Sequence, residues 1–162
     1  MTSAKRFAST DWKFSVELSS HAESALRLPA AKCRVRETGG ILIGKYSPDQ
    51  RTAFVTRVQG PPPDSRAGST WFVRGVRGLQ RVLSRYWARG EYYLGEWHYH
   101  PGAPIPSPED LQQIRAIASS VAYCCPEPLL CIVGSRGELR WFVAPRGGAE
   151  IELHRLCEGN NA

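Results

Sequence analysis

The order in which strand-like and helix-like segments alternate along the chain is the strongest constraint on its fold. Short alternating or continuous apolar runs predict strands over 12–18, 37–46, 51–59, 91–100, 128–134, 138–144 and 149–157. Capping residues and helical spacing of apolar residues predict helices over 20–37, 74–89 and 107–124, the first of which Pro29 must end or kink. This interspersed order favours an α+β (mixed α/β) domain over a regular doubly wound fold.

The length of the chain predicts one folded domain. The chain has 162 residues, within the range of about 100–200 expected for a single domain. We expect this domain to span residues 1–157, followed by a short frayed tail over 158–162.

The first ten residues lack the apolar run of a signal peptide, and no segment approaches the roughly 18 apolar residues of a membrane span. We therefore expect a cytoplasmic protein that does not contact the membrane.

Cysteine usage and charge narrow the class of protein. The number of cysteines is odd, at five, and no C-x-x-C pair occurs, which argues against a disulfide framework or a cysteine zinc ribbon. The net charge of +6 suits an acidic partner. Five arginines are spaced for one helix face, namely Arg74, Arg77, Arg81, Arg85 and Arg89. A solvated helix face explains these arginines without nucleic acid, and no RNA-binding or helix-turn-helix pattern accompanies them. We therefore do not expect a nucleic-acid partner and keep a basic nucleic-acid-binding module only as a rival hypothesis.

The stretch EWHYHP, residues 96–101, carries metal-binding chemistry. Side chains two residues apart on a strand share one face, with Cα atoms roughly 6.5–7 Å apart. His98 and His100 therefore project together and can reach a single zinc ion. A third ligand from a nearby helix start would leave one position open for water, as in catalytic zinc sites.

Residues 107–110, Ser-Pro-Glu-Asp, offer that third ligand but have a second explanation. A serine, a proline and an acid three residues after the serine are typical of a helix N-terminus with a capping box. Asp110 can thus be a capping residue, a metal ligand, or both, because a helix start also holds the aspartate in place. Gly39 and Gly40 fit no phosphate-binding motif and are expected to allow close backbone approach near the site.

Together these residues resemble the signature of the JAB1/MPN/Mov34 (JAMM) metalloproteases, and the bacterial JAB-domain branch in particular. The matching elements are Glu-Thr-Gly-Gly at 37–40, His-x-His-Pro at 98–101 and Ser-x-x-Asp at 107–110. The resemblance implies a single MPN/JAB-type domain with a central, mostly antiparallel curved sheet flanked by about three helices. Two positions depart from the family pattern. Six residues rather than seven separate His100 from Ser107, and Tyr99 replaces a small residue, so we expect a local loop adjustment and a tyrosine that points away from the histidines.

The resemblance also assigns roles to site residues. It makes His98, His100 and Asp110 the ligands of Zn²⁺, Glu37 the general base, and Ser107 a donor to the oxyanion. From spacing alone Glu96 is a rival, because it shares the strand face of the two histidines and can act as a base, a further ligand or an orienting partner. The resemblance favours Glu37.

The function that the resemblance implies is a zinc-dependent peptidase or isopeptidase. Its family implies substrates with an extended C-terminal tail, such as a ubiquitin-like protein or its conjugate. Bacterial relatives occur beside E1- and E2-like conjugation enzymes, including in antiphage systems, so deconjugation or precursor processing is expected. The alternative is a non-catalytic MPN scaffold that only binds partners.

Overall fold

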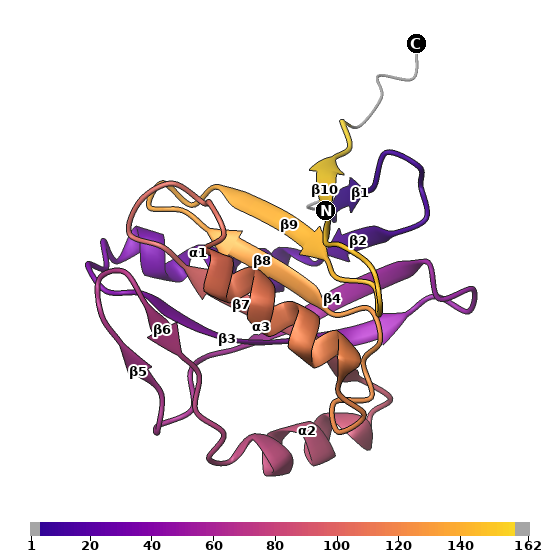
Figure 1. Ribbon diagram of the computed structural model, residues 1–162, viewed down its shortest axis with the longest axis horizontal. Coiled ribbons are helices and arrows are strands. Elements are labelled where there is room, and N and C mark those ends of the chain that lie inside the picture. The colour runs from indigo at the N-terminus through magenta and orange to yellow at the C-terminus, as the bar shows by residue number, and fades with distance from the viewer. Residues whose placement is uncertain (1–3, 158–162) are drawn as a thin grey trace.

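Eight strands close into a barrel in the computed structural model, which describes residues 4–157 (Figure 1). They follow the order β1-β10-β9-β8-β7-β3-β4-β2 around the barrel. Their bounds are Lys5–Ala8 (β1), Ser15–Leu18 (β2), Thr38–Tyr46 (β3), Thr52–Gln59 (β4), Tyr92–Tyr99 (β7), Leu129–Val133 (β8), Leu139–Val143 (β9) and Ile151–Arg155 (β10). All neighbouring pairs are antiparallel except β2–β4 and β7–β8. The predicted mostly antiparallel curved sheet is thus confirmed, and it closes on itself.

Three helices accompany the barrel in the described part of the chain: α1 (Ser20–Ala31), α2 (Leu79–Trp87) and α3 (Pro108–Ser119). Leu26 of α1 joins the apolar core inside the barrel, which includes Trp97 and Trp141. On the outside, α3 packs Ile114 and Ile117 against β8 and β9 in a second core (Figure 1). Because β8 is covered on both sides, all five of its residues are buried, which explains its continuous apolar sequence.

Strand β7 presents different chemistry on its two faces. Leu94, Trp97 and Tyr99 belong to the barrel core, whereas Glu96 and His98 lie on the α3 side. The alternation of faces is interrupted between Leu94 and Trp97, and Gly95 allows this irregularity. Its φ is 150°, and a Cβ there would lie 2.0 Å from a carbonyl oxygen of β8. The expectation that Tyr99 points away from the histidines is confirmed, and its hydroxyl donates to the carbonyl of Arg34 at 2.9 Å.

The predicted helix over 74–89 is too long. The chain from Arg74 to Gly78 is not helical, because Gly75 packs tightly against Asp64 and Gly78 adopts a φ of 82°. Helix α2 begins only after this glycine, so Arg74 and Arg77 are not part of it and the five arginines do not share one helix face. Pro29, in contrast, lies in the last turn of α1, which ends two residues later.

Three short elements were not predicted. They are strand β1 and a hairpin of two-residue strands, β5 (Arg66–Ala67) and β6 (Phe72–Val73). None of them is long enough for a sequence periodicity. The predicted frayed tail over 158–162 lies outside the described residues.

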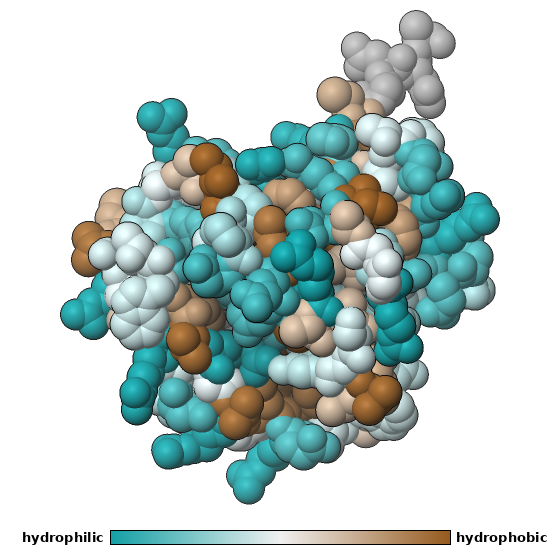
Figure 2. Space-filling view, in the orientation of Figure 1, coloured by the Kyte–Doolittle hydropathy of each residue, from teal (hydrophilic) through white to brown (hydrophobic). Residues whose placement is uncertain are grey.

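The surface is mixed in character (Figure 2). Apolar patches gather along its lower edge, where Figure 1 places α2, and none of the residues of α2 is buried. Within residues 4–157, no helix combines the length and the apolar character needed to cross a bilayer.

Candidate metal centre

The barrel brings three chain segments to one point. In the antiparallel pairing of β3 with β7, Thr38 lies opposite Tyr99 and Gly39 opposite His98, so Glu37 reaches the level of His100. Strands β7 and β8 are parallel, and α3 forms the crossover between them. The start of α3 therefore lies beyond the carboxyl end of β7, beside the histidines.

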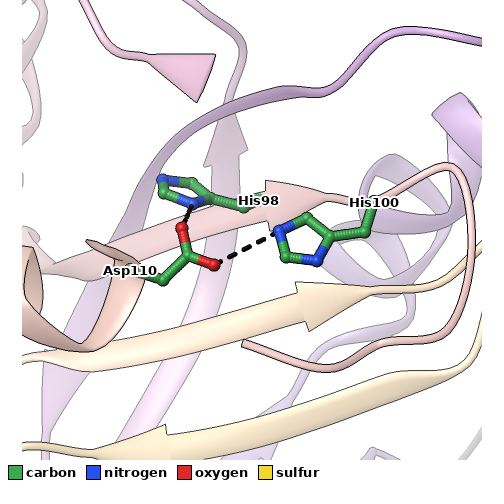
Figure 3. Close-up of side chains that lie close together, drawn as sticks. All are labelled: His98, His100 and Asp110. Carbon is green, nitrogen blue, oxygen red and sulfur yellow. Dashed lines mark hydrogen bonds and ion pairs between the residues drawn. The ribbon is translucent and has the colours of Figure 1, made fainter. Parts of the chain in front are cut away.

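A cluster on the α3 side of β7 is formed by His98, His100 and Asp110 (Figure 3). One carboxylate oxygen of Asp110 lies 2.7 Å from Nδ1 of His98, and the other lies 3.3 Å from Nε2 of His100. Glu37 is adjacent, with Oε1 3.9 Å from the same His100 nitrogen. The connection of six residues thus accommodates the cluster despite being one residue shorter than the family pattern.

The start of α3 supports both interpretations of residues 107–110. Ser107 is the N-cap: its Oγ accepts from the amide of Asp110 at 3.1 Å, and its own amide donates to Oδ2 of Asp110 at 2.8 Å. The Asp110 carboxylate therefore caps the helix and faces the histidines at once. Glu109 is exposed on another side of the helix.

The electrostatics of the cluster follow from its burial. Burial alone would raise the pKa of Asp110, but the imidazoles of His100 and His98 hold that pKa well below its usual range. Burial would lower the pKa of His100, but Asp110 and Glu37 outweigh it and raise that pKa. Burial raises the pKa of Glu37, which favours a carboxylate that accepts protons readily.

These residues fit a metal ion. Each of the three offers one ligand atom, and these atoms all lie within 4.8 Å of one another. Among the described residues, Nε2 of His98 and Nε2 of His100 are buried without a hydrogen-bond partner. For His100, the Asp110 oxygen at 3.3 Å is close enough but lacks hydrogen-bond alignment. Buried polar atoms normally have partners, and two imidazoles with one carboxylate match the donor set of many divalent metal sites.

Glu96 is placed away from the cluster. Its carboxylate accepts from Nε of Arg74 and from the hydroxyl of Tyr93, both at 2.7 Å. Arg74 and Phe72, whose ring packs edge-on against His98 at 5.3 Å between centroids, were not anticipated as neighbours of the site. No sequence signal identifies them, because both contacts depend on how the segment before α2 folds back.

A cavity of about 640 Å³ lies at the opposite end of β7, lined by residues such as Trp87, Tyr93 and Tyr123. It contains none of the cluster residues. We place the candidate site at the cluster because the convergent buried ligand atoms are there.

Comparison with known proteins identifies the family of the chain. Residues 19–144 match the family model described as prokaryotic homologs of the JAB domain. Over 155 residues the chain is 41% identical to "CD-NTase/cGAS isopeptidase" of Enterobacter hormaechei subsp. hoffmannii, a match that covers 93% of this chain and 86% of the relative. The solution structure of protein DSY2949 from Desulfitobacterium hafniense has the same fold, with a TM-score of 0.60 at 20% identity, over 83% of this chain and 87% of the other. The chain belongs to the prokaryotic JAB-domain family.

Proposed function

We propose that this protein is a zinc-dependent isopeptidase. The observation that carries the proposal is the buried Glu37 carboxylate 3.9 Å from an imidazole of the His98, His100 and Asp110 cluster. This arrangement combines a metal-binding donor set with a carboxylate placed to move protons. The relative named as an isopeptidase supports the same reaction class.

The ion would be held by His98, His100 and Asp110. Zinc bound there would supply Lewis-acid polarisation of the scissile carbonyl and would make a water molecule acidic near neutral pH. Glu37 takes the proton of the attacking water and delivers it to the leaving amine, a role that its raised pKa favours. Among the described residues, the Ser107 hydroxyl accepts a hydrogen bond but donates none, so its proton is free to stabilise the oxyanion.

The substrate we propose is a protein conjugate. Its scissile bond is an amide that joins the C-terminal tail of one protein to a lysine amine of another. The tail is extended, as in a ubiquitin-like protein. The name of the Enterobacter relative points to a CD-NTase of the cGAS kind as one of the joined proteins. A role beside E1- and E2-like enzymes in a bacterial antiphage system would follow.

Metal content is the first test. We expect about one zinc per chain in the purified protein by plasma mass spectrometry, and far less in His98→Ala and Asp110→Ala. Each substitution removes one of three protein ligands. A chain that stays free of zinc after reconstitution would contradict the proposal and would leave the scaffold alternative.

The role of Glu37 has its own test. Glu37→Gln keeps the shape of the side chain but cannot accept the proton, so we expect zinc content to be retained and conjugate cleavage to fall by about 10²–10⁴-fold. The assay follows release of the lysine-bearing protein from a CD-NTase conjugate on a gel. Cleavage at the wild-type rate would exclude Glu37 as the base.

A further inference from the structure

The hairpin formed by β5 and β6, residues 66–73, contacts two groups of the proposed site. The amide of Glu37 donates to the carbonyl of Gly68 at 2.8 Å. The ring of Phe72 packs against His98 at an interplanar angle of 77°. The hairpin thus touches the residue proposed to move the proton and a residue proposed to hold the metal.

This hairpin has little internal support. Each of its strands is two residues long, and it pairs with no other strand in the described part of the chain. Isolated two-stranded hairpins are marginally stable in water. Its side chains are also largely outside the cores, with Val73 60% and Trp71 49% exposed. Its position must therefore be held by neighbouring contacts.

Arg74, the residue directly after β6, provides such a contact. Its Nε donates to Oε2 of Glu96 at 2.7 Å, and the two side chains are only 3% and 2% exposed. Its other two nitrogens donate to the Gly75 carbonyl and the Tyr123 hydroxyl, both at 2.8 Å. Each guanidinium nitrogen therefore has a partner, and Glu96 lies on the strand that carries the histidines.

A buried ion pair of this kind is weak evidence of added stability. Apolar residues of similar volume often replace a buried pair without loss of stability, whereas removal of one partner alone is strongly destabilising. The planar guanidinium fork, in contrast, fixes the direction and distance at which two segments meet. An apolar pair has no such directional preference.

We propose that the Arg74–Glu96 pair anchors the hairpin so that Gly68 and Phe72 hold Glu37 and His98 in their working orientations. Arg74 is then a positioning residue, since its hydrogen-bond partners are Glu96, Gly75 and Tyr123 and it acts through the hairpin. The consequence for catalysis rests on the proposed function of Glu37. The consequence for the order of the hairpin does not rest on that function, because it is measured by the hydrogen exchange of the Glu37 backbone amide.

The test compares two apolar replacements of Arg–Glu pairs. Arg74→Met/Glu96→Leu removes the anchor, and the matched control Arg57→Met/Glu91→Leu removes the pair that joins β4 to the start of β7. Amide hydrogen exchange by NMR reports on the Glu37 N–H directly. We expect this amide to exchange at least tenfold faster in the first variant and within twofold of wild type in the control.

Kinetics and zinc content complete the experiment. For Arg74→Met/Glu96→Leu we expect a folded protein with about one zinc per chain, a kcat reduced at least tenfold and a KM within about twofold of wild type. The conservative Arg74→Lys keeps the charge but not the fork, so it should show the same two changes to a smaller degree. If the apolar double variant does not fold, Arg74→Lys alone decides the matter.

The proposal would be overturned if the folded double variant kept both the protection of the Glu37 amide and the wild-type kcat. When the double variant is unfolded, the same result in Arg74→Lys would overturn it. The pair would then only fill space. If wild type cleaves no conjugate, the proposed function fails, yet faster exchange at Glu37 would still support the anchor.

Discussion

At the scale of single residues, Gly39 shows how closely the backbone approaches the site. A Cβ at this position would lie 2.4 Å from the Trp97 carbonyl oxygen, 2.7 Å from the Phe72 ring and 2.8 Å from the His98 ring. Two of these neighbours, Phe72 and His98, belong to the hairpin and the cluster. The sequence-based expectation of close backbone approach here agrees with this geometry.

We predict that Gly39→Ala lowers the free energy of unfolding by about 1–3 kcal/mol, the usual range for overpacking. It should also reduce zinc content, because His98 must move. Urea denaturation and metal analysis measure the two effects. Gly60→Ala is the control, since a Cβ there meets nothing within 4 Å. Equal stability of both variants would show that the backbone at Gly39 adjusts freely.

At the scale of elements, the start of α3 gives one serine a structural role and a proposed chemical role. Ser107 caps the helix and is proposed to donate to the oxyanion. Ser19 caps α1 in the same way, by accepting from the amide of Ala22, but lies on a different element. Residues 4–157 thus contain two similar serine caps, of which the Ser107 cap is at the site.

This pair allows the two roles to be separated. Ser107→Ala should lower the free energy of unfolding by about 0.5–2 kcal/mol, whereas Ser107→Gly should lower it by only a few tenths. Both should reduce kcat by about 10²–10³-fold, because both remove the hydroxyl. Ser19→Ala should lower the free energy of unfolding at least as much as Ser107→Ala, because the Ser19 hydroxyl also donates to the Thr56 carbonyl at 3.3 Å, and it should leave kcat normal. A kcat in Ser107→Gly equal to that of wild type would rule out a role of the hydroxyl in turnover.

At the scale of the whole molecule, an ion pair joins two segments of the barrel that are distant in sequence. Glu91, just before β7, accepts from the Thr56 hydroxyl at 2.6 Å and lies 3.3 Å from Nε of Arg57 on β4. Burial acts to raise the pKa of Glu91, but these two partners outweigh it and hold the pKa below the ordinary 4.5. The folded state therefore binds the proton more weakly than the unfolded state does.

The sign of the pH dependence follows from this depressed pKa. The stabilisation by Glu91 is complete above about pH 4.5, the ordinary value, and is lost as the pH falls through the lower folded-state pKa. At pH 7 we expect Glu91→Gln to be less stable than wild type by about 1 kcal/mol, a figure reduced for the solvent screening of half-exposed Arg57. Urea unfolding from pH 7 to pH 3 should show the difference shrinking below pH 4.5. A difference that stays constant over this range would contradict the assignment.

Local patterns in the sequence determined most of the elements and singled out the residues of the cluster. Alternating and continuous apolar runs identified seven barrel strands, because side-chain periodicity is a property of a few consecutive residues. For the same reason the His98 and His100 pair and the start of α3 were readable directly. Both are defined by spacings of two or three residues.

Only the tertiary structure decided which distant residues meet. The β3–β7 register places Glu37 beside His100, and because these residues are about 60 positions apart in the chain, a pattern of a few consecutive residues cannot show that they meet. The tertiary structure also decided that Arg74 and Glu96 form a buried pair. From the sequence, Arg74 was predicted to lie on a helix face, and Glu96 was a rival for the role of base. Strand β1 and the β5–β6 hairpin are too short for a periodicity of their own, so they form only because the rest of the molecule provides their partners.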